Sequence, residues 1–318
     1  MHAVLNSALP VFALILTGFI CGFFGVFDKT ATDNLNRFAI YLALPSLMFT
    51  AMSKITPDQV KQFRFAGAFG GGFAVTFAVA FAVSRLRGRR VANASIEGLD
   101  AAYSNVGFMG IPMCLLVFGP ESAPVSIIAT LFTACILFLF LFLFLFAIVV
   151  IEIDLQKGYS FWSTGAKVAR AIFTSPLFIA PVAGLVVGLS GLSVPEPLIN
   201  FTMLLGGAAS PAALVCIGLF LAQERVVTHD IKSIGLLVSM KLVLQPAITA
   251  FLAFYVFSMP PLWSHSAVIL SALPIGSGPF TIAKLYAIEA GVTSGSILTS
   301  HVFAVLTVSL LVAWLAQI

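Results

Sequence analysis

Charged residues are scarce in this sequence. Asp, Glu, Lys and Arg make up only 9% of its 318 residues, whereas a soluble globular protein averages about 25%. Hydrophobic residues make up 60%, more than a soluble core of this size can bury, so we expect lipid to solvate much of the chain. The formal net charge of +4 indicates no nucleic-acid partner, because the basic residues lie in connecting loops, where they set membrane orientation.

The sequence also offers little for metal binding or enzyme chemistry. The four cysteines, Cys21, Cys114, Cys135 and Cys216, lie inside apolar runs without the spacing of metal ligands. We therefore expect them to act as small hydrophobic side chains, and we expect no metal or cofactor. The apolar segments show neither the paired aspartates of an intramembrane protease nor a Ser/His pair at matched depth. These features argue against a membrane enzyme.

Long apolar runs dominate what remains. A helix rises about 1.5 Å per residue and a bilayer core is about 30 Å thick, so a span needs about 20 apolar residues. The runs are too long and too uniformly apolar for barrel strands, which indicates helices. The sequence predicts an all-α polytopic membrane protein with ten transmembrane helices. They lie near residues 4–27, 35–52, 63–83, 99–118, 126–151, 172–189, 199–221, 234–257, 267–286 and 292–315.

The basic residues predict the orientation of these helices. If both termini are outside, the opposite side carries only Lys54, Lys61 and Arg64. Because cytoplasmic loops are enriched in Lys and Arg, both termini are expected on the outer side. The cytoplasmic loops then hold eleven basic residues: Lys29, Arg37, Arg85, Arg87, Arg89, Arg90, Lys157, Lys167, Arg170, Arg225 and Lys232.

The positions of prolines predict that the second half of the chain repeats the first. Three pairs are in register with the helix count, at offsets of 166, 166 and 167 residues: Pro10 with Pro176, Pro45 with Pro211, and Pro112 with Pro279. Each half holds five spans, an odd number, so the halves must insert in opposite orientations. We predict inverted repeats at 1–155 and 172–318, joined by a cytoplasmic connector at 156–171. Inverted repeats are typical of secondary transporters.

The fourth and ninth segments each carry two glycines and a proline near mid-span. Proline in a helix costs about 3 kcal/mol and glycine about 1 kcal/mol, so both helices should break there. Paired breaks free helix ends that can hold ions, which makes them candidates for a substrate-binding site. The residues are Gly107, Gly110 and Pro112 in the fourth segment, and Pro274, Gly276, Gly278 and Pro279 in the ninth.

The alternative is that these residues make only packing kinks, since Gly and Pro are common in membrane helices. The single prolines Pro45 and Pro211 are expected to be structural kinks at a helix interface. Pro10 and Pro176 are expected at ordinary helix starts.

Few ionisable residues lie at depth. Lys241 falls about eight residues into the eighth segment, roughly 12 Å below the surface, which predicts a functional role unless its amine reaches back to the interface. Glu97 is expected to be solvated. Asp100 could be a proton or cation site, or a partner for Lys241. His301 is expected to be a satisfied core histidine, with a proton relay as the alternative.

Several motifs along the chain resemble the auxin efflux carrier family of bacterial and plant transporters. The matching stretches are 43–49 (ALPSLMF), 105–112 (NVGFMGIP), 175–180 (SPLFIA), 240–246 (MKLVLQP) and 273–286. The resemblance implies two inverted five-helix repeats with broken crossover helices 4 and 9. It also implies a scaffold of helices 1, 2, 6 and 7, a moving transport part of helices 3–5 and 8–10, homodimers and elevator-like motion.

The resemblance also bears on substrate and site. The short connection between the halves resembles bacterial members linked to malate and malonate, which implies the bacterial inner membrane. Asn105 matches the anion-site asparagine of the family. Its counterpart in the second repeat is Ala272, so the site would be asymmetric, with Ser277, Thr281 and Lys241 as possible donors.

These observations predict a secondary active transporter or facilitator of small organic anions, such as carboxylates or auxin-like weak acids, that works by alternating access. Its partners would be the anion, membrane lipid and a second copy of the chain, with possible coupling to protons or sodium through Asp100. The alternative is a sodium- or proton-coupled carrier, or a cation/proton exchanger, of the same architecture. Loss of transport in Asp100→Asn but not in Asn105→Ala would favour that alternative.

Overall fold

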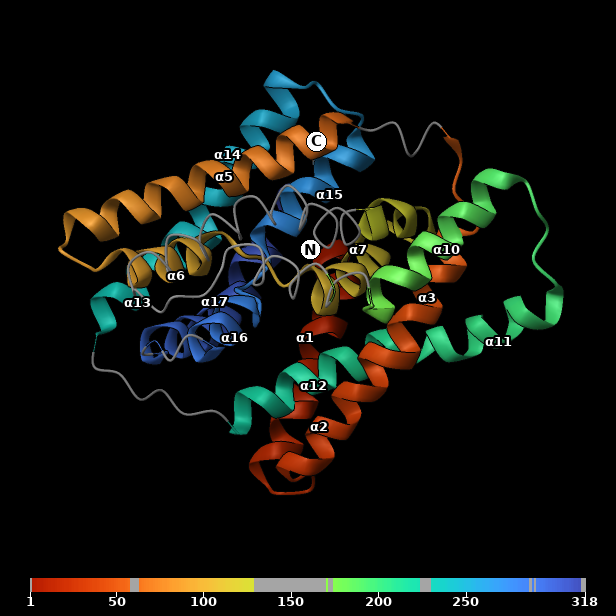
Figure 1. Cartoon of the computed structure of the whole chain (residues 1–318), viewed down its shortest axis with the longest axis horizontal. Helices are drawn as coiled ribbons and strands as arrows, with labels where there is room; N and C mark the ends of the chain where they lie inside the picture. Colours follow the sequence, from red (N-terminus) through yellow and green to blue (C-terminus); the bar gives the residue numbers. More distant parts are fainter. Residues whose placement is uncertain are drawn as a thin grey trace. The chain divides into compact units, whose positions relative to one another are not determined.

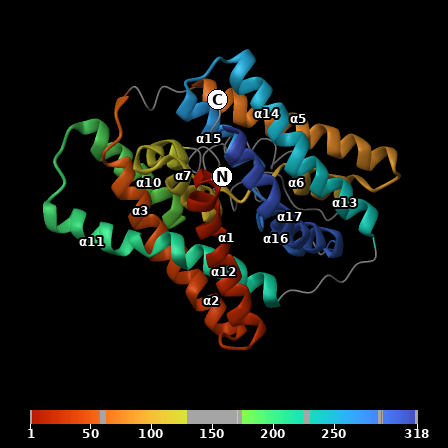
Figure 2. The same cartoon turned by 180° about the vertical axis from the view of Figure 1, so that it is seen from behind.

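The computed structural model describes residues 2–57, 63–128, 170, 174–223, 230–285, 288 and 290–315, and gives the backbone alone for 2–8, 281, 284 and 285. Helices make up nearly all of this part (Figures 1 and 2). Its residues cluster in two compact units. Unit 1 comprises Met1–Gln62, Gly107–Cys135 and Lys167–Glu224, and unit 2 comprises Phe63–Val106, Ile136–Ala166 and Arg225–Ile318.

Five helices in the described residues are long and apolar enough to cross a membrane: Lys29–Met52, Phe63–Leu86, Glu196–Gln223, Ile231–Val256 and Gly291–Leu315. The first, fourth, sixth and ninth predicted segments also coincide with helices. The fifth segment, 126–151, and the connector, 156–171, lie almost wholly outside the described residues. The all-helical prediction is therefore confirmed, while the count of ten spans stays a prediction.

Unit 1 holds the helices of the predicted scaffold. Its elements are α1 (His2–Phe23), α2 (Lys29–Phe38), η1 (Ala39–Ala43), α3 (Leu44–Met52), η3 (Pro120–Ser122), α7 (Ile111–Phe118), α10 (Pro176–Ser190), α11 (Glu196–Gly207) and α12 (Ala209–Gln223). Glycines let α1 and α12 approach closely, because a Cβ at Gly18 would lie 2.2 Å from the Val215 carbonyl oxygen and one at Gly218 would lie 1.9 Å from that of Ile15. Small residues at such contacts are typical of membrane helix pairs.

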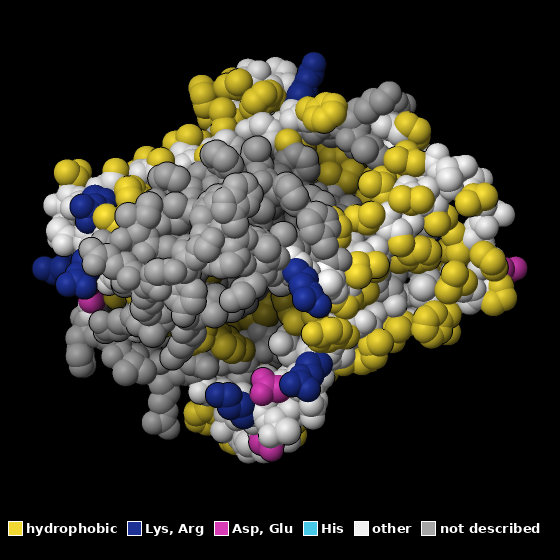
Figure 3. Space-filling view, viewed as in Figure 1, with side chains coloured by type: hydrophobic (Ala, Val, Ile, Leu, Met, Phe, Trp, Pro, Cys, Tyr) yellow, Lys and Arg dark blue, Asp and Glu magenta, His cyan; other side chains and the backbone are white. Residues whose placement is uncertain are grey.

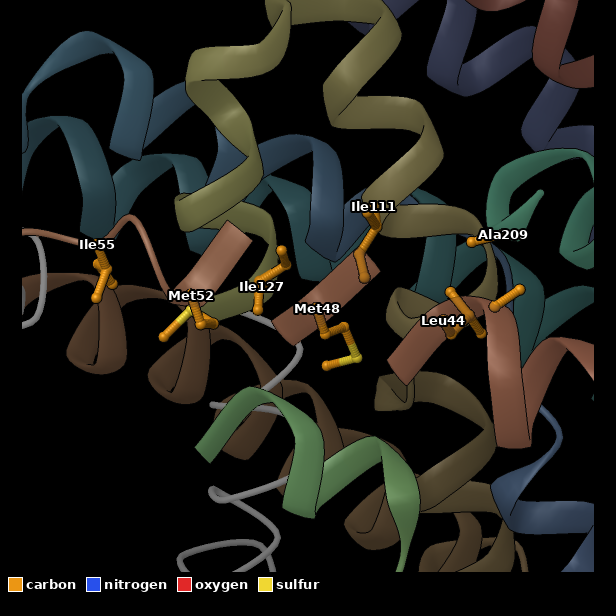
Figure 4. Packing of buried hydrophobic residues seen from close by; sticks show 8 residues of the cluster. Leu44, Met48, Met52, Ile55, Ile111, Ile127 and Ala209 are labelled. Atoms are coloured by element: carbon orange, nitrogen blue, oxygen red, sulfur yellow. The ribbon is translucent and has the colours of Figure 1, made fainter. Parts of the chain in front are cut away.

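The core of unit 1 forms around α3. Leu44, Met48 and Met52 point from α3 into a cluster with Ile111 and residues of neighbouring segments (Figure 4). The cluster is apolar, and a hydrogen bond of 2.8 Å between the Thr50 and Thr202 hydroxyls joins α3 to α11 beside it. Because lipid is as apolar as this core, close packing and such polar links hold membrane helices together.

Large hydrophobic side chains also cover the outside of unit 1. On the face where α10, α3 and α11 lie, they spread broadly over the surface (Figure 3). Leu204 of α11 is 83% exposed and Val186 of α10 is 62% exposed. A soluble monomer rarely shows large contiguous apolar patches, so this surface suits contact with lipid.

The prolines of unit 1 behave in different ways. Pro176 occupies the first position of α10, as predicted, where its missing N–H costs nothing. The expectation for Pro10 is wrong, because α1 begins at His2 and contains Pro10 in its interior. Pro45 stands just after the π-helical turn η1, and the helix continues through it without a break. A π-turn shifts the hydrogen-bond ladder by one residue, which accommodates the missing donor.

Unit 2 holds α5 (Phe63–Leu86), α6 (Val91–Ala102), α13 (Ile231–Ser239), η4 (Met240–Leu244), α14 (Gln245–Phe251), η5 (Leu252–Val256), α15 (Pro261–Ala272), α16 (Gly278–Leu285) and α17 (Gly291–Leu315). The turn η2 (Val106–Gly110) carries the chain from unit 2 to unit 1. Helix α5 packs against both α6 and α14. A Cβ at Gly98 would lie 2.9 Å from the Phe77 ring, and one at Gly72 would lie 2.0 Å from the Thr249 hydroxyl oxygen. Close packing of this kind holds α6, and the break that follows it, in place.

Candidate substrate and coupling site

Both predicted breaks are present. Helix α6 ends at Ala102, and Tyr103 after it has extended backbone angles (φ −84°, ψ 104°). Helix α15 ends at Ala272, and Leu273 is likewise extended (φ −62°, ψ 152°). The second break lies within its glycine- and proline-containing stretch, whereas the first precedes Gly107 and Gly110 of η2 and Pro112 of α7. Each break leaves peptide groups that need new partners.

The two breaks satisfy each other's peptide groups through a short antiparallel bridge. Ser104 stands opposite Ile275. The Asn105 N–H donates to the Pro274 carbonyl at 2.9 Å, and the Gly276 N–H donates to the Tyr103 carbonyl at 3.0 Å. Unpaired backbone groups are costly away from water, so this pairing explains how unit 2 tolerates two interrupted helices.

The glycines of the second break make room for an aromatic ring. A Cβ at Gly276 would lie 2.8 Å from Cε1 of Tyr103, and one at Gly278 would lie 2.8 Å from its Cζ. Real Cβ contacts are essentially never that short. These two glycines are therefore needed because the Tyr103 ring lies directly on the backbone of the other break.

The two breaks differ in their side chains. In the bridge Asn105 lies opposite Pro274, and Tyr103 lies opposite Gly276. Neither Pro274 nor Ala272, the counterpart that the predicted repeat gives, has an amide side chain. One break thus presents an amide and the other does not, so the crossing is chemically asymmetric.

The other predicted contact residues are spread over several environments. Pro274, Gly276 and Pro279 are buried, Gly278 is half-buried and Ser277 is exposed. Thr281 lies in α16, and its side chain is outside the described residues. The crossing of the two breaks lies within unit 2, whereas three predicted contact residues belong to unit 1: Gly107, Gly110 and Pro112. Their role in substrate binding stays a prediction.

Lys241 is fully buried, and its amine caps the second break. The Nζ atom donates to the Ser271 carbonyl at 2.5 Å. In an uninterrupted helix that carbonyl would accept from the N–H of Ile275, which instead donates to the Ser300 hydroxyl at 3.1 Å. The break thus leaves the Ser271 carbonyl without its helical donor, and the Lys241 amine donates to it. The alternative of an amine that reaches the interface is wrong.

Gln245 performs the same role at the first break. Its Nε2 atom donates to the Ala102 carbonyl at 2.8 Å, which is the last carbonyl of α6. Gln245 is one helical turn after Lys241, so one face of η4 and α14 caps both interrupted helices. Its Oε1 atom has no hydrogen-bond partner among the described residues. Sequence reasoning assigned Gln245 no role, although its spacing of four from Lys241 was a usable signal.

Asp100 is fully buried in α6, two residues before the break. Its Oδ2 atom accepts from the Thr293 hydroxyl of α17 at 2.9 Å. Its Oδ1 atom has no hydrogen-bond partner in the part of the chain that the structure describes. The proposed pairing with Lys241 is not found, because the lysine amine donates to the Ser271 carbonyl instead.

Glu97 is buried, so the expectation of a solvated side chain is wrong. It accepts a hydrogen bond from the Ser84 hydroxyl and forms an ion pair with Nε of Arg89 at 3.3 Å. Arg89 also pairs with Asp230, the N-cap of α13. The hydrogen bonds from the Ser233 backbone and hydroxyl, together with Arg89, hold the pKa of Asp230 below its usual value. We call Arg89, Glu97 and Asp230 the Arg89 cluster.

A cavity of about 100 Å³ lies beside the Arg89 cluster. Its walls include all three residues of the cluster together with Asn93 and Thr293. The Arg89 and Asp230 side chains remain 35% and 32% exposed, so the cavity begins at the surface of unit 2. Because Thr293 also donates to Asp100, the cavity extends to the first partner of the buried carboxylate.

His301 of α17 is buried and only partly satisfied. Its Nδ1 atom lies 2.8 Å from the Ile297 carbonyl oxygen, as expected of a core histidine. Its Nε2 atom has no partner among the described residues. No group of three or more His, Cys, Asp or Glu side chains in those residues could hold a metal ion.

Known proteins similar to this chain are transporters. A family described as membrane transport protein matches residues 3–312. A protein of Rhizobium meliloti named "Putative malonate transporter" is 30% identical over 320 residues, covering 97% of this chain and 95% of that protein. An uncharacterized transporter of Methanothermobacter thermautotrophicus is 24% identical over 309 residues, which are 96% of each chain. Another, of Methanocaldococcus jannaschii, is 21% identical over 319 residues.

These matches cover nearly the whole chain rather than one segment. Together with the long apolar helices they identify an integral membrane protein that is a transporter and not an enzyme. The resemblance to the auxin efflux carrier family is confirmed. The chain belongs to the membrane transport protein family.

Proposed function

We propose that this transporter is a secondary carrier of small organic anions of the malonate type. The observation that carries the proposal is the crossing of two interrupted helices with the buried amine of Lys241 capping one of them. A buried charge at membrane depth is expensive and is usually functional. An anion at the crossing would be stabilised by this amine, and the similarity to a protein named as a malonate transporter favours a carboxylate.

Asn105 supplies the selective contact in this proposal. Its backbone is fixed by the bridge to Pro274, and its side chain is half-buried at the end of the break. A side-chain amide in such a position can donate to a carboxylate oxygen. Ser277 and Thr281, which follow the second break, are the proposed additional donors.

The mechanism we propose is alternating access with elevator-like motion of a homodimer in the bacterial inner membrane. The proline register and the odd number of predicted spans in each half support inverted repeats, and the distribution of Lys and Arg supports termini on the outer side. The clustering into two units is in keeping with a scaffold and a moving part, since unit 1 holds the first, second, sixth and seventh segments. One element differs from the predicted division. Helix α7 belongs to the fourth segment, which was predicted in the moving part, but it clusters with unit 1.

Energetics constrain the direction of transport. Moving one charge across 100 mV is worth about 2.3 kcal/mol. Efflux of an anion from a negative interior therefore needs no coupling ion, whereas uptake of a dianion needs co-transported cations.

Uptake of radiolabelled malonate, malate and indole acetate into proteoliposomes tests the proposal. We expect malonate or malate uptake above that of empty vesicles, and a loss of about tenfold or more in Asn105→Ala, which corresponds to about 1.4 kcal/mol of lost binding. Asn34→Ala, an exposed asparagine of α2, is the matched control and should transport like the wild type. The proposal fails if no anion moves across a range of pH and voltage.

A cation/proton exchanger remains the second candidate, because Asp100 is a buried carboxylate with one oxygen unpaired among the described residues. In an exchanger, transport would depend on Asp100 and be indifferent to Asn105. Loss of transport in Asn105→Ala supports the anion carrier.

A further inference from the structure

Asp100 is a buried carboxyl group with few hydrogen-bond donors around it. The side chain is fully buried. The described residues give it one neutral donor, the Thr293 hydroxyl at 2.9 Å, and leave Oδ1 without a partner. A buried carboxylate with neither a cation nor a full set of donors is costly and is commonly neutralised by a proton.

The cavity beside the Arg89 cluster offers a route for that proton. With about 100 Å³ it has room for a few water molecules, each of which occupies about 30 Å³ in the liquid. It reaches from the partly exposed Arg89 and Asp230 side chains to Thr293. The hydroxyl of Thr293 can accept from a cavity water while it donates to Asp100, because a hydroxyl both donates and accepts.

The charged side chains nearest to Asp100 along α6 and η4 already have hydrogen-bond or ion-pair partners. Glu97, three residues before Asp100, pairs with Arg89, which also pairs with Asp230. The amine of Lys241 donates to the Ser271 carbonyl. The remaining titratable groups on the elements packed against α6 are Arg64 and Arg85 of α5, Lys232 of α13, His301 of α17, Lys284 of α16, whose side chain is outside the described residues, and Tyr103 of the break itself.

We propose that Asp100 is the proton-binding residue of the carrier and that it exchanges one proton per transport cycle with water in the cavity through the Thr293 hydroxyl. An O–H bond of a hydronium ion breaks as Thr293 accepts the proton, and the O–H of Thr293 passes its own proton to the carboxylate. The products are water and a neutral carboxyl group. This inference rests on the proposed anion transport and assigns its coupling ion.

The position of Asp100 explains how its protonation would affect binding of the anion. Asp100 is two residues before the end of α6, whose last carbonyl is capped by Gln245. The bridge that holds Asn105 follows directly. A change of charge on Asp100 therefore acts within a few residues of the proposed anion contact.

The test compares malonate counterflow at equal pH with net accumulation driven by a pH gradient, in proteoliposomes clamped at zero voltage with potassium and valinomycin. Coupling to one proton predicts that accumulation rises about tenfold for each unit by which the outside is more acidic. Asp100→Asn should keep counterflow and lose this dependence. Asp33→Asn makes the same substitution at an exposed carboxylate of α2 and should keep both.

Thr293→Val gives a second, independent readout. The variant removes the hydroxyl that relays the proton to Asp100, so accumulation driven by the pH gradient should fall about tenfold or more while counterflow at equal pH persists; unchanged pH-driven accumulation in this variant would overturn the relay. If Asp100→Asn does not insert, proton uptake by the wild type, followed with a pH-sensitive dye inside the vesicles, should still show about one proton per malonate.

The outcomes separate the two claims. Absence of malonate counterflow in the wild type refutes the proposed function itself. Counterflow without a pH-driven component overturns the inference alone, as does accumulation that follows a sodium gradient instead. Asp100→Asn that still accumulates malonate along the pH gradient also overturns it.

Discussion

Replacing Gly276 by alanine should break the contact between the two interrupted helices. The new Cβ would lie 2.8 Å from Cε1 and 2.9 Å from Cδ1 of the Tyr103 ring, and 3.4 Å from Cα of Asn105. The ring cannot retreat freely, because it also lies on Gly278. Overpacking of this kind costs about 1–3 kcal/mol, and displacement of the bridge would add to the cost.

The assay is thermal unfolding of the purified carrier in detergent, together with malonate uptake. We expect Gly276→Ala to lower the melting temperature by about 2–6 °C, since 1 kcal/mol is worth about 2–4 °C in chains of 150–250 residues and less in longer ones. Malonate uptake should fall as well, because the bridge fixes Asn105.

Two variants make this prediction sharp. Gly235→Ala in α13 is the control, because its Cβ would meet nothing within 4 Å, and alanine in a helix is favoured over glycine by about 1 kcal/mol. In a Tyr103→Ala background the cost of Gly276→Ala should largely disappear, as expected for residues in contact. Equal melting temperatures of Gly276→Ala and Gly235→Ala would refute the reasoning.

Two further predictions concern the capping side chains. Gln245→Leu leaves the Ala102 carbonyl without its donor and should destabilise the protein by about 1–2 kcal/mol; a stability equal to the wild type in thermal unfolding would contradict this. The lowered pKa of Asp230 means that its contribution to stability is present above the unfolded pKa of about 3.9 and is lost as the pH falls through the folded value. The wild type should therefore lose stability below about pH 4 more steeply than Asp230→Asn, and parallel profiles of melting temperature against pH would count against it.

The sequence predicted the interrupted helices because the signals are local. Glycine and proline act through the backbone of their own helix, so Pro274 and Gly276 indicate the second break without knowledge of any neighbour. The first break lies a few residues before the predicted Gly107, which is part of η2. The depth of Lys241 could likewise be predicted from helical rise alone. Its acceptor could not, because the Ser271 carbonyl became free only through the break of a helix 30 residues away.

Contacts between residues far apart in the sequence explain what the sequence did not predict about Glu97 and the crossing of the two breaks. Glu97 was expected to be solvated, but the Ser84 hydroxyl and Arg89 enclose it, and Asp230 joins them from 141 residues away. The bridge between Ser104 and Ile275 depends on how α6 and α15 meet, which no local pattern encodes.

Binding of malonate to the purified protein, measured by isothermal titration calorimetry, tests the central claim most directly. The proposed carrier should bind malonate saturably, and Lys241→Met, which keeps a long apolar side chain but removes the buried amine, should bind at least about tenfold more weakly, a loss of about 1.4 kcal/mol or more. Equal affinity in Lys241→Met, or no saturable binding of any dicarboxylate to the wild type, would contradict a carboxylate carrier built around this amine.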